Sequence, residues 1–262
     1  MVGTSAVVLT LYAIGVYTLI YAPIVMLAIY SFNDAMFITP TWDGFTLKWY
    51  RALLENPNLH EAFRNSFTLG LATAAISTII GVAFAFAFRK SFLAKNAMFN
   101  LMLLPMLTPG IVFGVALILF WNLLHLRPSL FGSTLVGHVT YTLPFIFLII
   151  FPRLHQFEHQ LEEAAMDLGA DELTTFWEVT FPLIKPGIVA SALFAFTLSF
   201  DEFIRTLFLV GSDNTLPIFL WSMIEQDISP QTNAIATVIM VFSLLWAFVG
   251  QLILTRSGGG AS

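Results

Sequence analysis

The sequence predicts an all-α polytopic membrane protein with about six transmembrane helices. Hydrophobic residues make up 58% of the 262 residues and charged residues only 10%, and the mean hydropathy is +0.84. A soluble domain carries roughly 25% charged residues, so a water-soluble fold of this length could not bury so much apolar surface. The apolar runs also reach the roughly 20 residues that a membrane helix needs. These observations favour a single transmembrane domain over residues 1–262.

Six segments have the length and composition of membrane spans. They are 6–30, 66–88, 97–121, 134–151, 183–200 and 233–254, and Lys185 is the only Asp, Glu, Lys or Arg within them. Backbone groups in lipid must be satisfied internally, so each span is predicted to be a helix. The first is interpreted as a retained span, because no basic residue precedes it and it exceeds the roughly 7–15 residues of a signal-peptide core.

Four local features refine this picture. Small residues in 71–75 and 81–87 predict that another helix approaches the second span closely. Pro105 and Pro109 interrupt the third span, and a simple kink is favoured over a bend that shapes a pathway, since Pro is common in membrane helices. The pieces 207–210 and 216–223 are too short to span and predict a re-entrant or interfacial segment. Residues 257–262 predict a flexible tail.

The connection 152–182 is the most informative stretch of the chain. Its first half has an apolar stripe at helical spacing, formed by Leu161, Ala164, Ala165 and Leu168. Gly169 suits the C′ position after a helix, where φ is positive. Asp171 suits the N-cap of a second short helix. That helix carries Leu173, Phe176 and Trp177, and Pro182 is expected to end it.

The polar face of these two short helices is acidic. Helices that lie on a membrane surface usually carry Lys and Arg on the polar face. An acidic face is instead repelled by anionic lipid. Docking into a partner protein is therefore favoured over lying on the membrane, with Phe176 and Trp177 as candidate anchors.

The same connection carries a family resemblance. Glu163-Ala164-Ala165, three residues, Gly169, nine residues and Val179-x-Phe181-Pro182 resemble the EAA loop of bacterial binding-protein-dependent ABC importer permeases, whose pattern is EAA-x3-G-x9-I-x-L-P. The departures are Val179 for Ile and Phe181 for Leu, both apolar. Residues 21–25, 31–33, 45–50 and 196–202 are similar to the spermidine/putrescine permeases, most closely to the second permease subunit of those systems.

The resemblance implies the type I ABC importer permease fold in the bacterial inner membrane. In that family the loop docks into a cleft of a cytoplasmic ATPase, and closure of the ATPase dimer rocks the membrane helices. The coupling residues that it implies here are Glu163, Ala164, Ala165, Gly169, Asp171, Phe176, Trp177 and Pro182. The implied partners are the ATPase dimer, a second homologous permease, an extracytoplasmic binding protein and membrane lipid.

No phosphate-binding loop of the form G-x-x-x-x-G-K-[ST] occurs, so this chain is not expected to hydrolyse ATP. ATP and Mg would be used by the partner ATPase, and this chain is predicted to be non-catalytic, with no cofactor and no metal of its own. Basic residues are few and scattered, so no nucleic-acid partner is expected.

Asp201 and Glu202, at the end of the fifth span, are the candidate substrate residues. Carboxylates beside a membrane helix are costly unless they are paired, hydrated or facing a cavity. Two interpretations stay open: a salt bridge with Arg205 at i+3 or i+4, or a ring that attracts the ammonium groups of a polyamine. Trp221 is a candidate cation–π partner, although a place in the core is the commoner role.

Two alternatives to polyamine import remain. The same architecture could import another small polar solute, such as γ-aminobutyrate, an opine or a phosphonate. A secondary transporter is an alternative of another class, but it should carry ionisable groups at mid-span or helices broken in two inverted halves. The spans contain no acidic residue.

Overall fold

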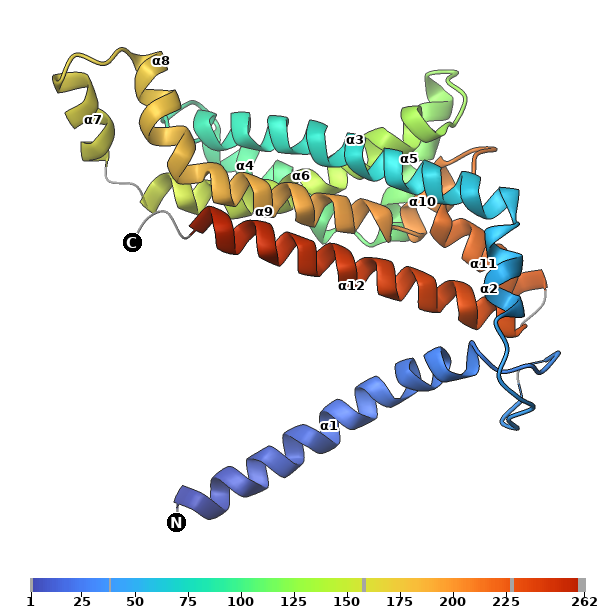
Figure 1. The fold of residues 1–262 in the computed structure, drawn as a ribbon. Helices are drawn as coiled ribbons and strands as arrows, with labels where there is room; N and C mark the ends of the chain where they lie inside the picture. The colour runs from blue at the N-terminus through green and yellow to red at the C-terminus, as the bar shows by residue number, and fades with distance from the viewer. Residues whose placement is uncertain (1, 38, 157–158, 227–228, 259–262) are drawn as a thin grey trace. The chain divides into compact units, whose positions relative to one another are not determined.

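The computed structural model describes residues 2–37, 39–156, 159–226 and 229–258, which form helices and the turns between them (Figure 1). The chain divides into two compact units, Met1–His60 with Leu220–Leu244, and Glu61–Phe219 with Leu245–Ser262. In chain order the helices are α1 (Val2–Tyr30), α2 (Lys48–Leu54), α3 (Pro57–Ala87), α4 (Lys95–Leu107), α5 (Gly110–Leu123), η1 (Leu130–Thr134), α6 (Leu135–Gln156), α7 (His159–Asp167), α8 (Glu172–Thr175), η2 (Phe176–Thr180), α9 (Phe181–Phe200), α10 (Ile204–Leu209), α11 (Leu216–Gln226) and α12 (Pro230–Gly258).

Five helical stretches are long and apolar enough to cross a membrane, and one bent pair of helices brings the count to six. The stretches are Ala6–Tyr30, Pro57–Ala87, Leu130–Leu154, Glu172–Phe200 and Pro230–Ile253, and the bent pair is Lys95–Leu107 with Gly110–Leu123. The prediction of an all-α protein with about six spans is therefore confirmed. Most stretches extend beyond the apolar segments read from the sequence, because polar residues continue the same helices at their ends.

The larger unit is built on α3, α6 and α9, which run side by side (Figure 1). Its core contains Ile146, Phe147 and Ile150 of α6 and Ile184 and Phe196 of α9, all of them buried. A Cβ at Gly81 would lie 2.5 Å from Cγ2 of Ile146. The close helix approach predicted for the small residues of the second span is thus confirmed at Gly81.

The prediction of a simple kink in the third span is wrong. Helices α4 and α5 are bent by 108° at the break between them. Thr108 and Pro109 are both extended there, with ψ of 130° and 135°. Proline lacks an N–H and disfavours helical backbone at the residue before it, which ends α4 at Leu107. The Thr108 N–H and hydroxyl both donate to the Leu104 carbonyl, which satisfies one of the freed acceptors.

Pro182 does not end the second short helix, which is a further correction. Residues Glu172–Phe200 form one helical stretch, with Pro182 in the first turn of α9. The turn before it, η2, is a π-helix in which the Phe181 N–H donates to the Phe176 carbonyl. Such a wider turn lets the helix accommodate an irregularity, so the proline is tolerated. The segment 172–180 is consequently a direct extension of the membrane helix α9.

In the smaller unit, α1 is apolar, and no residue of its best membrane window is buried. The loop after α1 is ordered by Asn33, whose side chain donates to the Thr41 carbonyl and accepts from the Asp43 N–H. The Trp49 indole N–H donates to the Asn33 carbonyl. At the other end of the chain α12 continues to Gly258, so Ser257 and Gly258, which the sequence placed in a flexible tail, are helical; the rest of the predicted tail, 259–262, lies outside the described residues.

Candidate functional site

The segment 159–180, called the acidic hairpin below, comprises α7, a tight turn, α8 and η2. Gly169 has φ of +95°. Its N–H donates to the Met166 carbonyl, while the Ala170 N–H donates to the Ala165 carbonyl. These two bonds form a Schellman motif with Gly169 at C′. The predicted helix end is therefore confirmed at the residue that the sequence indicated.

Asp171 caps the second helix of the acidic hairpin, as predicted. Its carboxylate accepts from the Thr174 N–H at 2.8 Å. Hydrogen bonding with the side chain of Thr174, and then with its backbone, holds the pKa of the Asp171 carboxyl below its ordinary value. The negative charge of a carboxylate at this position is also stabilised by the positive end of the helix dipole.

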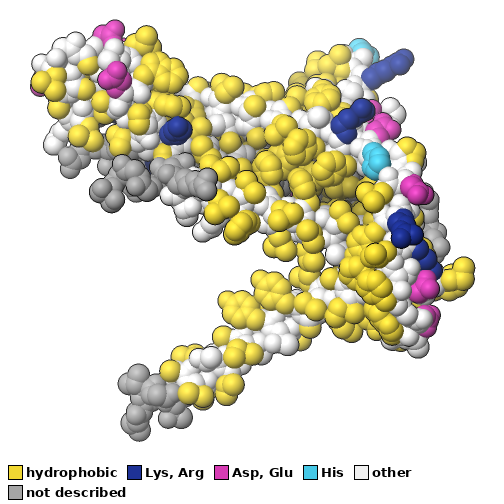
Figure 2. All heavy atoms as spheres, in the orientation of Figure 1, with side chains coloured by type: hydrophobic (Ala, Val, Ile, Leu, Met, Phe, Trp, Pro, Cys, Tyr) yellow, Lys and Arg dark blue, Asp and Glu magenta, His cyan; other side chains and the backbone are white. Residues whose placement is uncertain are grey.

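The outer surface of the acidic hairpin exposes large apolar side chains. Leu168 is 91% exposed at the turn, Leu173 is 66% exposed on α8, and Trp177 is 55% exposed on η2. Figure 2 shows acidic side chains among apolar ones at this end of the bundle, whereas hydrophobic side chains dominate along α3 and α9. Exposed apolar groups of this size on a polar segment are typical of an interaction surface.

The structure separates the two predicted anchors. Phe176 is half-buried and packs edge-on against Phe86 of α3, with ring centroids 5.6 Å apart. Trp177, which also contacts Phe176 and Phe181, faces outward. Trp177 is therefore the more accessible of the two predicted anchors. The turn of η2 decides this, since consecutive residues of a helix cannot share one face.

Glu163 and Ala164 are exposed on α7, Ala165 is half-buried and Pro182 is exposed at the start of α9. The neighbouring Glu162, which the sequence reasoning did not single out, turns inward. Its carboxylate accepts from Arg89 Nη1 at 2.9 Å and Nη2 at 2.7 Å. The Thr180 hydroxyl also donates to it, at 2.7 Å.

A hollow of about 570 Å³ lies between the end of α3 and the acidic hairpin. Its lining residues come from both elements: Phe86, Ala87, Arg89, Lys90, Glu162, Met166, Glu172, Thr175, Phe176 and Thr180. The Thr175 hydroxyl is buried without a hydrogen-bond partner among the described residues. The hairpin is thus joined to α3 across an incompletely packed interface.

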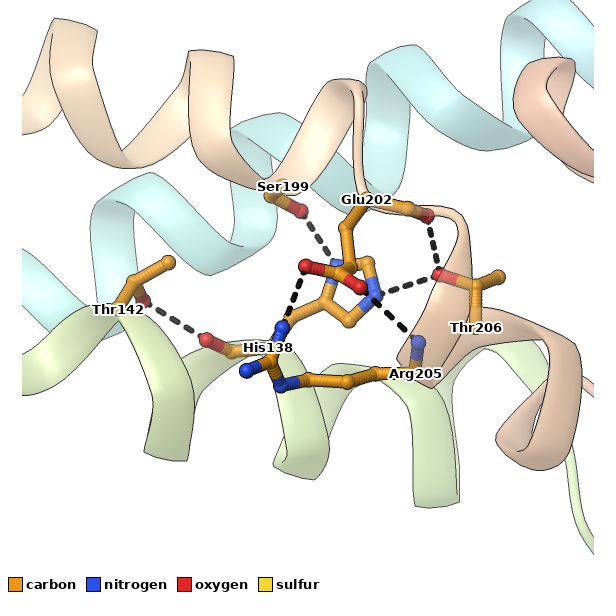
Figure 3. A network of polar contacts seen from close by, with 6 residues as sticks. All are labelled: His138, Thr142, Ser199, Glu202, Arg205 and Thr206. Carbon is orange, nitrogen blue, oxygen red and sulfur yellow. Dashed lines mark hydrogen bonds and ion pairs between the residues drawn. The ribbon is translucent and has the colours of Figure 1, made fainter. Parts of the chain in front are cut away.

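The second candidate site is a polar network where α9 meets α10 (Figure 3). Glu202 accepts from the Arg205 N–H at 2.9 Å and from Arg205 Nη1 at 2.8 Å, and the two side chains are 10% and 8% exposed. The guanidinium lies 3.6 Å from the centroid of the Tyr141 ring. Glu202 therefore accepts from the first turn of α10 and pairs with Arg205, the salt bridge that one of the two interpretations expected.

His138 of α6 is at the centre of this network, and the sequence reasoning missed it. Its Nδ1 lies 2.7 Å from the Ser199 hydroxyl, and its Nε2 lies 2.9 Å from the Thr206 hydroxyl. A single histidine inside the apolar span 134–151 was the available signal, since polar groups in a membrane are usually paired. The network joins α6, α9 and α10 by directional hydrogen bonds, which fix their relative orientation more closely than apolar packing alone would.

Asp201 behaves differently from Glu202. The residue is exposed, and no ion pair to its carboxylate occurs within the described part of the chain. Partial burial raises the pKa of the Asp201 carboxyl above its ordinary value. Trp221 lies on α11 in the smaller unit and is 42% exposed. Among the described residues, no three His, Cys, Asp or Glu side chains are grouped as a metal site requires.

Comparison with known proteins accounts for this combination of a membrane bundle and an acidic hairpin. Residues 77–257 match the model of the binding-protein-dependent transport system inner membrane component. The spermidine/putrescine transport system permease protein PotC of Shigella flexneri is 36% identical over 251 residues, which are 94% of each chain. The putrescine permease PotI of Escherichia coli K12 is 32% identical over 249 residues, covering 92% of this chain and 88% of PotI.

Solved structures show the same fold at low identity. A chain of a bacterial ABC transporter that imports alginate has a TM-score of 0.70 at 18% identity, covering 95% of this chain and 94% of that one. A chain of a methionine ABC transporter in an inward-facing conformation has a TM-score of 0.61 at 18% identity, covering 81% and 99%. With its apolar helices and the matched family model, this chain belongs to the binding-protein-dependent ABC importer permeases, as a multi-pass protein of the inner membrane.

Proposed function

We propose that this chain is a permease subunit of an ATP-driven importer for polyamines, with spermidine and putrescine as its substrates. The observation that carries the substrate class is the 36% identity, over nearly the whole chain, to permeases named for these two compounds. Residues 1–262 act as one transmembrane domain, which forms the translocation pathway together with a second, homologous permease. Lipid contacts the apolar surfaces of the spans, including α1.

The acidic hairpin is the contact with a cytoplasmic ATPase dimer. Support comes from its Schellman turn at Gly169, its cap at Asp171 and its exposed apolar residues, all of which precede the apolar segment 183–200 read from the sequence. Trp177 is the anchor that becomes buried when the ATPase docks. Glu163, Ala164 and Ala165 form the adjoining face of α7, and Pro182 leads into α9. Phe176 supports the surface from beneath. The connection 152–182 is accordingly the coupling loop.

This chain is the non-catalytic partner, and ATP with Mg is used by the ATPase. An extracytoplasmic binding protein delivers the substrate, a role supported by the alginate importer that was solved with its periplasmic protein. Asp201 attracts the cationic substrate at the outer end of α9, because its carboxylate is exposed and no ion pair joins it to a cation of the described residues. Glu202 is engaged with Arg205, and Trp221 is a separate candidate for cation–π contact.

The test is uptake by the assembled importer in vesicles, with labelled putrescine, spermidine and γ-aminobutyrate and with or without internal ATP. The expected result is ATP-dependent uptake of putrescine or spermidine and no uptake of γ-aminobutyrate. Uptake that needs no ATP would contradict the importer assignment. Uptake of γ-aminobutyrate without either polyamine would contradict the substrate class and leave the importer intact.

A further inference from the structure

We infer that Glu162 is the positioning residue that transmits movement of the acidic hairpin to α3. The unit that does this is the Glu162 node, defined as Arg89, Glu162 and Thr180. The inference rests on the proposed function, since it assigns the route by which the ATPase moves the membrane helices. It concerns an intramolecular contact and leaves the contact with the ATPase to the exposed residues of the hairpin.

The node connects three elements at one carboxylate. Arg89 follows the last turn of α3, Glu162 lies in the first turn of α7, and Thr180 is the residue before α9. Two guanidinium nitrogens and one hydroxyl donate to the two oxygens of Glu162. A forked pair of this kind fixes direction as well as distance, so neither partner can turn without the other.

Charge also favours the node where it lies. A carboxylate in the first turn of a helix and a cation after the last turn of another are each stabilised by the helix dipoles. The Arg89 and Glu162 side chains are 17% and 15% exposed, so water screens the pair only weakly. The pair is consequently stronger than an ordinary surface salt bridge.

Packing around the node is too open to transmit movement by itself. The hollow of about 570 Å³ separates much of the hairpin from the end of α3, and all three residues of the node line it. Besides the node, Phe176 on Phe86 is the aromatic contact between the hairpin and α3. The position of α7 relative to α3 therefore depends on the node.

Movement of α9 needs no such device, because η2 and α9 belong to one helical stretch. A pull on the hairpin reaches α9 through its own backbone, whereas α3 is reached only through side chains. Farther along the bundle α3 packs directly against α9: the Phe67 and Phe196 rings are in contact, and the Ser199 hydroxyl donates to Thr73. The node adds a link at the hairpin end of α3. Without it, the ATPase would still bind and still hydrolyse ATP, but this end of α3 would no longer move with the hairpin.

The experiment compares Glu162→Gln with the wild type in the assembled importer, measuring both ATP hydrolysis and polyamine uptake. Uptake per ATP is expected to fall about tenfold while hydrolysis changes less than about twofold, which corresponds to the loss of an ordinary coupling interaction. Arg89→Lys, which keeps the positive charge but cannot donate from two guanidinium nitrogens, should also lower uptake per ATP. Lys90→Gln, which removes an exposed cation beside Arg89 and outside the acidic hairpin, is the matched control and should retain the wild-type ratio.

A second readout follows the geometry directly. The chain has no cysteine, so spin labels can be placed at Leu93→Cys and Leu168→Cys, which are 97% and 91% exposed, in an importer whose other subunits carry no reactive cysteine. The distance distribution between them should be narrow in the wild type and broader in Glu162→Gln. If Glu162→Gln does not assemble, Thr180→Val and Arg89→Lys, which preserve the charges, provide the same comparison.

Each outcome has one meaning. An unchanged uptake per ATP in assembled Glu162→Gln and Arg89→Lys would overturn the inference, as would an unchanged distance distribution. Absence of ATP-driven polyamine uptake in the wild type would overturn the proposed function instead, and the spin-label comparison would then still test whether the node positions α7.

Discussion

At the scale of single residues, Asp201 and Glu202 illustrate how adjacent carboxylates acquire different roles. Glu202 is held by Arg205 in a buried pair, whereas Asp201 is exposed at the end of α9. Removing one partner of a buried pair typically costs about 3–5 kcal/mol, because the other charge is left uncompensated. Glu202 is therefore tied to the stability of α10, and Asp201 is the carboxylate for which we propose contact with a cationic substrate.

The pKa of Asp201 predicts how uptake responds to external pH. Because burial raises this pKa, protonation begins at a higher pH than the ordinary value of about 3.9. Uptake of a cationic substrate should fall as external pH is lowered through the raised pKa, and Asp201→Asn should give slower uptake that lacks this step. Initial rates in a pH series would measure both. An identical pH profile in Asp201→Asn would contradict the assigned role.

The raised pKa of Asp201 also predicts how the free energy of unfolding depends on pH, and this dependence runs opposite to that of uptake. The folded state favours the protonated form of Asp201, so the free energy of unfolding should decrease as pH rises from the ordinary pKa through the raised one. In Asp201→Asn this decrease should disappear. The contribution of Asp201 to binding and its contribution to stability therefore change in opposite directions with pH.

Gly169 gives a second prediction at this scale. Its φ of +95° is unfavourable for residues with a Cβ, and a Cβ there would meet nothing within 4 Å. Gly169→Ala should therefore act through backbone strain alone, at a cost of about 1–2 kcal/mol, and lower uptake per ATP. Gly169→Asn should be closer to the wild type, because Asn is the other residue that helix C′ positions accept. Equal effects of Ala and Asn would argue against strain as the cause.

At the scale of elements, the contact between α3 and α6 is the most sensitive to side-chain size. A Cβ on Gly81 would lie 2.5 Å from Cγ2 of the fully buried Ile146. Gly81→Ala should destabilise the bundle by about 1–3 kcal/mol through overpacking, seen as a lower midpoint of thermal unfolding in detergent. Gly15→Ala on α1 is the matched control, since a Cβ there meets nothing within 4 Å.

A double substitution separates crowding from other causes. In Ile146→Ala the atom that obstructs a Cβ on Gly81 is absent, so adding Gly81→Ala should cost less in that background than in the wild type. Additive losses would show that the two sites do not interact.

The elements also show what could be read from the sequence. Local signals predicted the Gly169 turn and the Asp171 cap, since each depends on the chemistry of a few adjacent residues. The break at Thr108–Pro109 and the passage of the helix through Pro182 were misjudged, because the effect of a proline depends on the backbone around it. The break is larger than a kink at one proline, and the π-turn accommodates the other.

Residues whose partners lie far along the chain were beyond this kind of reasoning. Arg89 and Glu162 are 73 positions apart, and His138 and Ser199 are 61 apart. Composition placed all four near or within membrane spans but could not pair them. The contact of Phe176 with Phe86 was out of reach for a related reason: it is tertiary.

At the scale of the whole molecule, membership of the ABC importer permeases argues against a secondary transporter. The order of the helices in the larger unit also predicts which of its loops lie on the same side of the membrane. The turn after α3 and the acidic hairpin lie together, because Arg89 bonds to Glu162. Helix α6 leads to that end, so the segment before η1 lies at the other end of the bundle.

Cysteine labelling can test this arrangement on a background without cysteine. Leu93→Cys and Leu168→Cys should react with an impermeant thiol reagent from the cytoplasmic face. Leu126→Cys, which replaces an exposed residue before η1, should react from the opposite face. Labelling of Leu126→Cys and Leu168→Cys from one face would contradict the topology.

The bend between α4 and α5 has a consequence for the lipid around it. The two helices, of 13 and 14 residues, are each about 20 Å long, shorter than the hydrocarbon core of about 30 Å. With a turn of 108° between them, together they advance only about 25 Å from end to end. Taken as one span, as in the count of six, this pair crosses the core only where the bilayer thins by several ångströms, a deformation that the longer helical stretches do not require. Membranes of long saturated lipids, which resist thinning, should therefore oppose the native position of α4 and α5 before they affect the other helices.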